Sequence, residues 1–445
     1  MKTNILLFVI TLTILSFNYT KAQEGTKTVL DLEKAIKLAL DNNYDHKIAK
    51  YNKLIADEQV TEAWGSAVFP EIKGLVNYRR ALKKGVFVID APGFSGTFPI
   101  GTDNTLTSTL SLKQTLFSGA AFIGIRAAEV FADMQKYYVE VSESQVKYQV
   151  KEAYYLTLLS KEVVDLSLAN LNRAKDNLKN TESLHKAGLV ADYDLVRAKV
   201  QVQMLEPQYE EALNSLTNAE NALKLATGLE IRSAIEIKDK ITFIDGLVTD
   251  YDLYVSEMRR TNPVLKAQQE EINLRDAAVS VYFAQHFPTL AAFGNWNVEA
   301  QENDDRSIGD WRFNNSVTLG LELQIPIFNG WQTSAKVSQA ELEHKIAQEN
   351  LKKTRDILTN RLEATILKIE NSRAKVKSYS EATTEAELAF SLSEKRFNSG
   401  VGTQLEVIDS QLGVTSAKFN YLSAIYEYLM AVTTLEQLLN REIYK

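Results

Sequence analysis

Apolar residues recur at heptad-like intervals along two long stretches of the chain, between Gly119 and Gly188 and between Gly330 and Gly400. The repeating positions include Val164, Leu171 and Leu178 in the first stretch and Leu358, Leu362, Ile369 and Val376 in the second. Neither stretch contains a proline that would break a helix. A helix of about 70 residues is about 100 Å long, far longer than an ordinary globular domain is wide. The pattern therefore predicts two very long helices.

Four shorter segments also favour helices: 30–64, 191–227, 251–286 and 403–440. Each is about half as long as one long helix, so two of them laid end to end match it at the same rise per residue. We expect each half of the chain to contain one long helix packed against two stacked short ones. A cytoskeletal coiled coil has a similar helical pattern, but the strands and the export signal described below disfavour that class.

The chain contains an internal repeat at a spacing of about 212 residues. Three motifs return in the same order: Phe69-Pro70-Glu71-Ile72 as Phe287-Pro288-Thr289-Leu290, Leu116-Phe117-Ser118-Gly119 as Ile327-Phe328-Asn329-Gly330, and His185-Lys186-Ala187-Gly188 as Phe397-Asn398-Ser399-Gly400. Each match is short, but three at a nearly constant offset indicate duplication. We predict two repeats, 30–230 and 251–441, joined by a connector.

Alternation of apolar and polar residues predicts four strands, near 71–80, 107–117, 289–299 and 315–328. In the last, Val317, Leu319 and Leu321 alternate with Thr318, Gly320 and Glu322. Each strand has about ten residues, the length that crosses a bilayer at a tilt. The segments between paired strands, 81–105 and 301–314, are rich in Gly, Pro, Asp and Asn, and we expect them to form outward-facing loops.

The same alternation would fit one sheet of a soluble sandwich. The long helices lead away from the strands, however, and supply no second layer. Strands in lipid must close into a barrel, and the smallest membrane barrels have about eight strands. Four strands per chain therefore require more than one copy. Tyr78 and Trp296 are predicted to lie near strand ends, where membrane-interface aromatic residues are found.

Residues 1–22 have the pattern of a cleaved signal peptide. Met1-Lys2 is a short basic start, residues 5–17 are mostly apolar, and small residues precede Gln23. The apolar run is about 13 residues long, whereas a membrane-spanning helix needs about 20, so an uncleaved anchor is the less favoured alternative. We expect residues 23–445 to form a single exported protomer.

The composition disfavours several other classes of protein. The chain has no cysteine and four histidines, none at a metal-binding spacing, and it has no Gly-rich phosphate loop or Ser-His-Asp arrangement. We therefore expect no metal, no cofactor and no enzymatic activity. The formal net charge of −7 disfavours nucleic acid as a partner.

These features resemble the TolC-like outer-membrane efflux proteins over almost all of the mature chain. The resemblance rests on the duplicated plan, the aromatic-Pro strand entries, the strand exits at Gly119 and Gly330, and the turn at 396–403 followed by 405–409. It implies a mainly α fold with a membrane β part. Long antiparallel helices would form a periplasmic α-barrel, and four strands per chain would contribute to a twelve-stranded transmembrane β-barrel in a homotrimer.

The resemblance also implies a function in the outer membrane, with the helices in the periplasm. The chain would be the exit duct of a tripartite efflux or type I secretion system, passively conducting substrates from an inner-membrane pump (RND or ABC type) and a periplasmic adaptor. A periplasmic adaptor protein is the alternative, but four membrane-length strands disfavour it. Whether the cargo is drugs, metals or proteins is left open by the sequence.

In this family the two turns that end the long helices form a periplasmic tip that docks the adaptor. The matching residues here are Gly188, Leu189, Phe397, Gly400, Val401, Gly402 and Thr403. Gly188 and Gly400 also suit left-handed helix caps, a conformation that needs no partner to explain it.

Four charged residues follow the turns: Asp194, Arg197, Glu406 and Asp409. Glu406 and Asp409 are three residues apart on one helical face, so a threefold copy would place six carboxylates around the pore mouth and favour cations. Arg197 could pair with Asp409 or Glu406 of a neighbouring helix and hold the tip shut, as similar pairs do in the family. An ordinary solvated helix face is the alternative.

Overall fold

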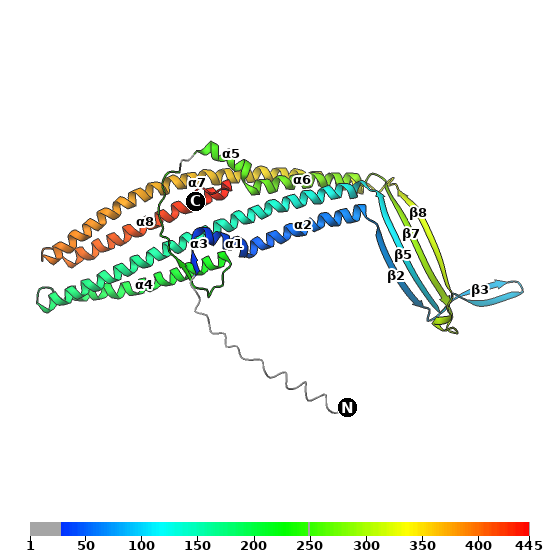
Figure 1. Ribbon diagram of the computed structural model, residues 1–445, viewed down its shortest axis with the longest axis horizontal. Coiled ribbons are helices and arrows are strands. Elements are labelled where there is room, and N and C mark those ends of the chain that lie inside the picture. Colours follow the sequence, from blue (N-terminus) through cyan, green and yellow to red (C-terminus); the bar gives the residue numbers. More distant parts are fainter. Residues whose placement is uncertain (1–27, 248–249, 445) are drawn as a thin grey trace, which may run out of the picture.

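The computed structural model describes residues 28–247 and 250–444, which form a long shaft of helices with a β-sheet at one end (Figure 1). The predicted signal peptide lies outside the described residues. The helices are α1 (Leu32–Asn42), α2 (Tyr44–Val68), α3 (Gly119–Lys186), α4 (Asp192–Thr227), α5 (Tyr251–Thr261), α6 (Pro263–Ala284), α7 (Gln332–Asn398) and α8 (Gln404–Leu439). The strands are β1 (Thr28–Leu30), β2 (Glu71–Arg80), β3 (Gly85–Ala91), β4 (Phe94–Ile100), β5 (Asn104–Phe117), β6 (Ile235–Ile237), β7 (Thr289–Glu302) and β8 (Phe313–Gln324).

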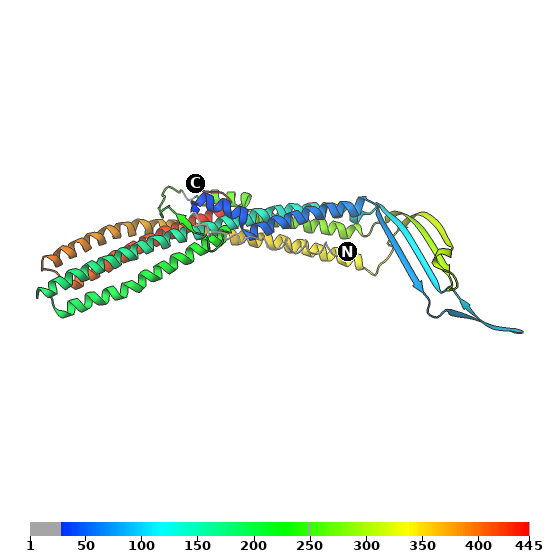
Figure 2. The same cartoon turned by 60° about the horizontal axis from the view of Figure 1, so that its bottom comes forward.

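The two predicted long helices are confirmed: α3 has 68 residues and α7 has 67. Both run along the whole shaft (Figures 1 and 2). On the sheet side, α2, α3, α6 and α7 lie next to one another in that order, and on the far side the order is α4, α3, α8, α7. We call the far end, where α3 turns into α4 and α7 into α8, the tip.

The predicted helices 30–64 and 251–286 are each two helices, because an asparagine interrupts them. The side-chain oxygen of Asn43 accepts hydrogen bonds from the backbone N–H groups of Asp45 and His46, at 2.9 and 3.2 Å. Asn262 caps α6 in the same way, and Pro263 follows it at the first helical position. Each asparagine thus ends one helix and begins the next.

The same two asparagines join the stacked half-length helices end to end. The Asn43 side-chain N–H donates to the carbonyl of Ala226 at the end of α4, and that of Asn262 donates to Leu438 at the end of α8. Ala226 and Leu438 are separated by the repeat spacing. Both halves of the chain therefore form this joint through equivalent contacts.

The largest apolar core lies midway along the shaft and joins both halves. Its fully buried residues include Leu30, Tyr154, Met258, Ile369 and Leu435. The parallel pair β1 and β6 packs at the same level, and the C-terminal end of the chain lies there too (Figure 1). Burial in this region comes from segments that are far apart in the sequence, so neither half completes the core alone.

A buried ion pair crosses this core. The Lys151 Nζ atom on α3 lies 2.7 Å from a carboxylate oxygen of Glu436 on α8, and the two side chains are 6% and 9% exposed. The other oxygen of Glu436 accepts from the backbone N–H groups of Ile443 and Tyr444. Glu436 therefore connects α3, α8 and the C-terminal segment.

The main sheet is antiparallel, with the order β2-β5-β7-β8. The predicted strand 315–328 is wrong at its end, because β8 stops at Gln324. Pro326, with no N–H to donate, lies just beyond. The strands β5 and β7 extend three residues beyond their predicted bounds on the side away from the helices.

The prediction that 81–105 is a loop is also wrong, because this segment contains the β-hairpin β3–β4. The hairpin turns at Pro92-Gly93, where Gly93 has a φ of 90°. It projects beyond the end of the main sheet (Figures 1 and 2). The chain therefore has a structured extension at the end opposite the tip.

Candidate functional site

The main sheet has two chemically different faces. Successive rows across one face are Ile72, Leu112, Gly294 and Leu319, then Gly74, Leu110, Trp296 and Val317. The row between them, on the opposite face, is Lys73, Ser111, Asn295 and Thr318. The apolar face is uncovered, since Val317 and Leu319 are 71% and 81% exposed. An exposed aliphatic face opposite a polar one suits a sheet with lipid on one side and water on the other.

Both edges of this sheet are open. Among the described strands, β2 pairs with β5 alone and β8 with β7 alone. Each edge therefore presents a row of unpaired backbone N–H and C=O groups, which cannot remain unpaired in lipid.

The two predicted interface aromatic residues lie at different depths. Tyr78 is two residues from the end of β2; its hydroxyl donates to Asn104 at 2.7 Å and its ring stacks on Trp311, 6.4 Å between centroids. Trp296, expected near a strand end, is in the middle of β7, because that strand continues to Glu302. Trp311 was missed by the sequence analysis, although it is the aromatic residue of the loop next to Tyr78.

The two tip turns have the same backbone structure. Gly188 and Gly400 both have a φ of 75°. In the first turn the N–H of Leu189 donates to the carbonyl of Leu184 at 2.9 Å, and in the second the N–H of Val401 donates to that of Arg396 at 3.1 Å. This six-residue hydrogen bond closes a helix around a left-handed glycine.

Several of the predicted docking residues are accessible. Leu189 and Val401 are 71% and 68% exposed, one on each turn. Phe397 instead is buried and packs in a cluster with Phe390, Val407 and Val414. It shapes the turn rather than presenting a surface to a partner.

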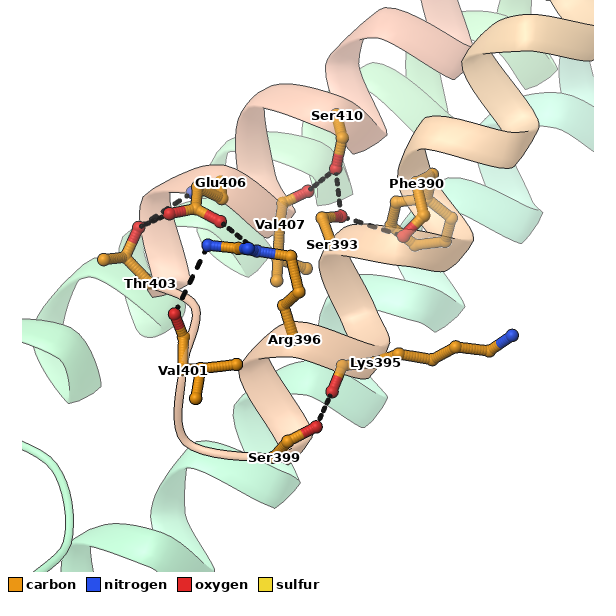
Figure 3. Close-up of polar contacts among 10 residues, drawn as sticks. All are labelled: Phe390, Ser393, Lys395, Arg396, Ser399, Val401, Thr403, Glu406, Val407 and Ser410. Carbon is orange, nitrogen blue, oxygen red and sulfur yellow. Dashed lines mark hydrogen bonds and ion pairs between the residues drawn. The ribbon is translucent and has the colours of Figure 1, made fainter.

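The second turn is closed by contacts within one chain (Figure 3). The Thr403 hydroxyl caps α8 by accepting from the backbone N–H of Glu406 at 3.3 Å. Arg396, at the end of α7, lies 3.3 Å from a carboxylate oxygen of Glu406 and also donates to the carbonyl of Val401. A Cβ atom on Gly402 would lie 2.9 Å from the Cβ of Arg396, so only glycine allows the chain to pass this closely. Sequence reasoning missed the Arg396–Glu406 pair.

The other predicted charges are arranged differently. Asp194 and Arg197 are half-buried and Asp409 is exposed. Within the described part of the chain none of these three forms an ion pair. The first turn has its own closing contact, between His185 and Asp192 at 2.6 Å.

The part of the chain that the structure describes has no group of three His, Cys, Asp or Glu side chains that could hold a metal ion. None of the described helices combines the length and the apolar character needed to cross a membrane.

The sequence profile of the outer membrane efflux proteins matches residues 35–229 and 254–441. The chain is 24% identical to outer membrane protein TolC of Vibrio cholerae over 68% of this chain and 70% of that protein. It is 22% identical to outer membrane protein TolC of Escherichia coli over 69% of this chain and 64% of that protein.

The fold is similar to that of the CmeC outer membrane channel of Campylobacter jejuni. The TM-score is 0.74, the sequences are 19% identical, and the match covers 92% of this chain and 85% of that one.

Proposed function

Since the chain belongs to the outer membrane efflux protein family, we propose that it is the outer-membrane exit duct of a tripartite efflux or type I secretion system. The observation that carries the proposal is a sheet with one exposed apolar face and one polar face, mounted on a helical shaft of about 100 Å. The sheet crosses the outer membrane and the shaft extends into the periplasm. Transport is passive, and the chain itself catalyses no reaction.

The open edges support a homotrimer. Strand directions alternate across the sheet, so β2 of one copy pairs antiparallel with β8 of the next, and three copies close twelve strands. The outer helices of the shaft are also uncovered, with exposed apolar side chains on α2 (Tyr44, Ile48, Tyr51) and on α7 (Leu342, Ile346). Because α2 and α7 are the two lateral edges of the sheet-side shaft, each stripe would be covered by the neighbouring copy.

The tip supports docking of a periplasmic adaptor that connects the duct to an inner-membrane pump of the RND or ABC type. Leu189 and Val401 supply exposed apolar side chains at the two turns. Gly188, Gly400, Gly402 and Thr403 fix the backbone that presents them.

The four tip charges have three roles in this proposal. Glu406 is held by Arg396 of its own chain, so it closes the hairpin. Asp409 is exposed and is therefore the carboxylate that Arg197 of a neighbouring copy would reach. Asp194, in the first turn of α4, adds negative charge at the same level.

The test is the mass of the detergent-extracted protein by light scattering, followed by single-channel recording. We expect a trimer with a small, cation-preferring conductance that rises in Arg197→Ala but not in the matched variant Lys199→Ala. A monomer that forms no pore would refute the duct. A trimeric pore unchanged by Arg197→Ala would refute only the gating role.

A further inference from the structure

The β3–β4 hairpin has one completely apolar face. The cross-strand pairs on that face are Gly85 with Ile100, Phe87 with Phe98, Ile89 with Gly96, and Ala91 with Phe94. The opposite face is mixed: it carries Asp90, Ser95 and Thr97 together with Val86, Val88 and Pro99. Phe87, Phe94, Phe98 and Ile100 are all about half exposed. No other described segment covers this face, so a hairpin that projects into water leaves three phenylalanines uncovered.

The base of the hairpin is held firmly on its own chain. Lys84 lies 3.0 Å from a carboxylate oxygen of Asp103 and donates to the side-chain oxygen of Asn303. Arg80 pairs with Asp304 at 2.8 Å. These contacts bind both ends of the hairpin segment to the loop between β7 and β8. The position of the apolar face is therefore set by the sheet.

The electrostatics of this region disfavour a lipid surface as the partner. Residues 79–103 and 302–312 contain six basic and six acidic side chains. Anionic lipid head groups attract segments with surplus positive charge. This region has no surplus of positive charge.

The β4 edge of the hairpin is also unsuited to binding an added strand. Pro99 in β4 has no N–H, and a proline within a strand is tolerated where that position faces away from the paired strand. A partner strand is therefore not expected to add to the β4 edge.

The hairpin continues directly from β2, the open edge strand where the proposed function places the next copy. We propose that the occupant of the apolar face is the same hairpin of a second copy. In a trimer the three hairpins would then converge through Phe87, Phe94 and Phe98 above the outer end of the duct. This inference rests on the proposed function, because it requires the copies to share a barrel.

The absence of cysteine allows a clean proximity test on the full-length protein in outer-membrane vesicles. Ala91→Cys places a thiol on the apolar face, and Ser95→Cys places one on the opposite face at the same end of the hairpin. After treatment with a short bismaleimide, we expect a yield of cross-linked chains that is several-fold higher for Ala91→Cys. Adding Phe87→Ser and Phe98→Ser should lower that yield to the level of Ser95→Cys.

The mass of each variant in detergent separates the two hypotheses. A trimer in which Ala91→Cys and Ser95→Cys cross-link equally, or not at all, overturns the hairpin contact and leaves the duct intact. Quenching of a fluorophore on Ala91→Cys by spin-labelled lipid would also overturn it, in favour of insertion into the outer leaflet. A monomer overturns both.

Discussion

Breaking the buried ion pair between Lys151 and Glu436 should strongly destabilise the shaft. Lys151→Met leaves the Glu436 carboxylate buried without its cation, and Glu436→Leu leaves the Lys151 ammonium buried without its anion. Removing one partner of a buried pair typically costs about 3–5 kcal/mol. We therefore expect each single variant to lose about that much free energy of unfolding.

The double variant should lose far less than the sum of the two. With both charges replaced by apolar groups of similar size, the main remaining loss is the two hydrogen bonds from the backbone of Ile443 and Tyr444, at about 1 kcal/mol each. A double loss of about 2 kcal/mol, against a sum of about 6–10 kcal/mol, is the signature of a coupled pair.

The assay is chemical unfolding of the detergent-solubilised protein followed by far-UV circular dichroism, with refolding checked before free energies are taken. Lys352→Met is the control, because its pair with Glu349 is two-thirds or more exposed, and little change is expected. Losses that add within about 0.5 kcal/mol would refute the reasoning, since they would mean that the two charges do not depend on each other.

Three further predictions concern single positions. Gly400→Ala should destabilise the second tip turn by about 1–2 kcal/mol, because alanine is strained at φ 75°, and proteolysis at the tip measures this effect. Gly413→Ala within α8, where a Cβ meets nothing within 4 Å, should instead stabilise the protein by about 0.5–1 kcal/mol, as measured by chemical unfolding. Gly320→Ala should lower the yield of assembled oligomer on native gels, because a Cβ there would lie 2.6 Å from the Phe293 ring, while Gly74→Ala, with open space around it, should not. Burial lowers the pKa of His46 below its ordinary value of 6.5; Lys50 lowers it further, and Glu143 opposes the shift. Just below pH 6.5 the unfolded chain therefore binds more protons than the folded chain. Stability should therefore fall as the pH drops through 6.5 toward the lowered pKa, and a pH slope that persists in His46→Leu would contradict this.

The long helices could be predicted because their pattern extends over nearly 70 residues without proline, so single irregularities do not obscure it. The breaks at Asn43 and Asn262 were not predicted, since one cap within a periodic segment is a weak signal. The Asn262-Pro263 pair could have revealed the second break, because proline favours the first position of a helix. The hairpin was missed because its Gly and Pro residues also fit an irregular loop.

At the tip, the left-handed conformation of Gly188 and Gly400 could be predicted from their place after each long helix, and the structure confirms it. The Arg396–Glu406 pair could not be found from sequence. The two residues are ten positions apart across a turn, a spacing that matches no helical or strand period. Their contact depends on how α7 and α8 pack.

The central core also constrains the order in which the chain can fold. Leu30 is among the first described residues and Leu435 is close to the end of the chain, yet both are fully buried in one cluster. A chain emerging from the export machinery with its N-terminus first cannot complete this cluster until α8 has followed. Contacts of such large sequence separation form slowly and leave apolar surface exposed in the meantime. In a truncated chain that lacks α8, this shared core would thus remain incomplete in both repeats. Only full-length chains would then be competent to assemble.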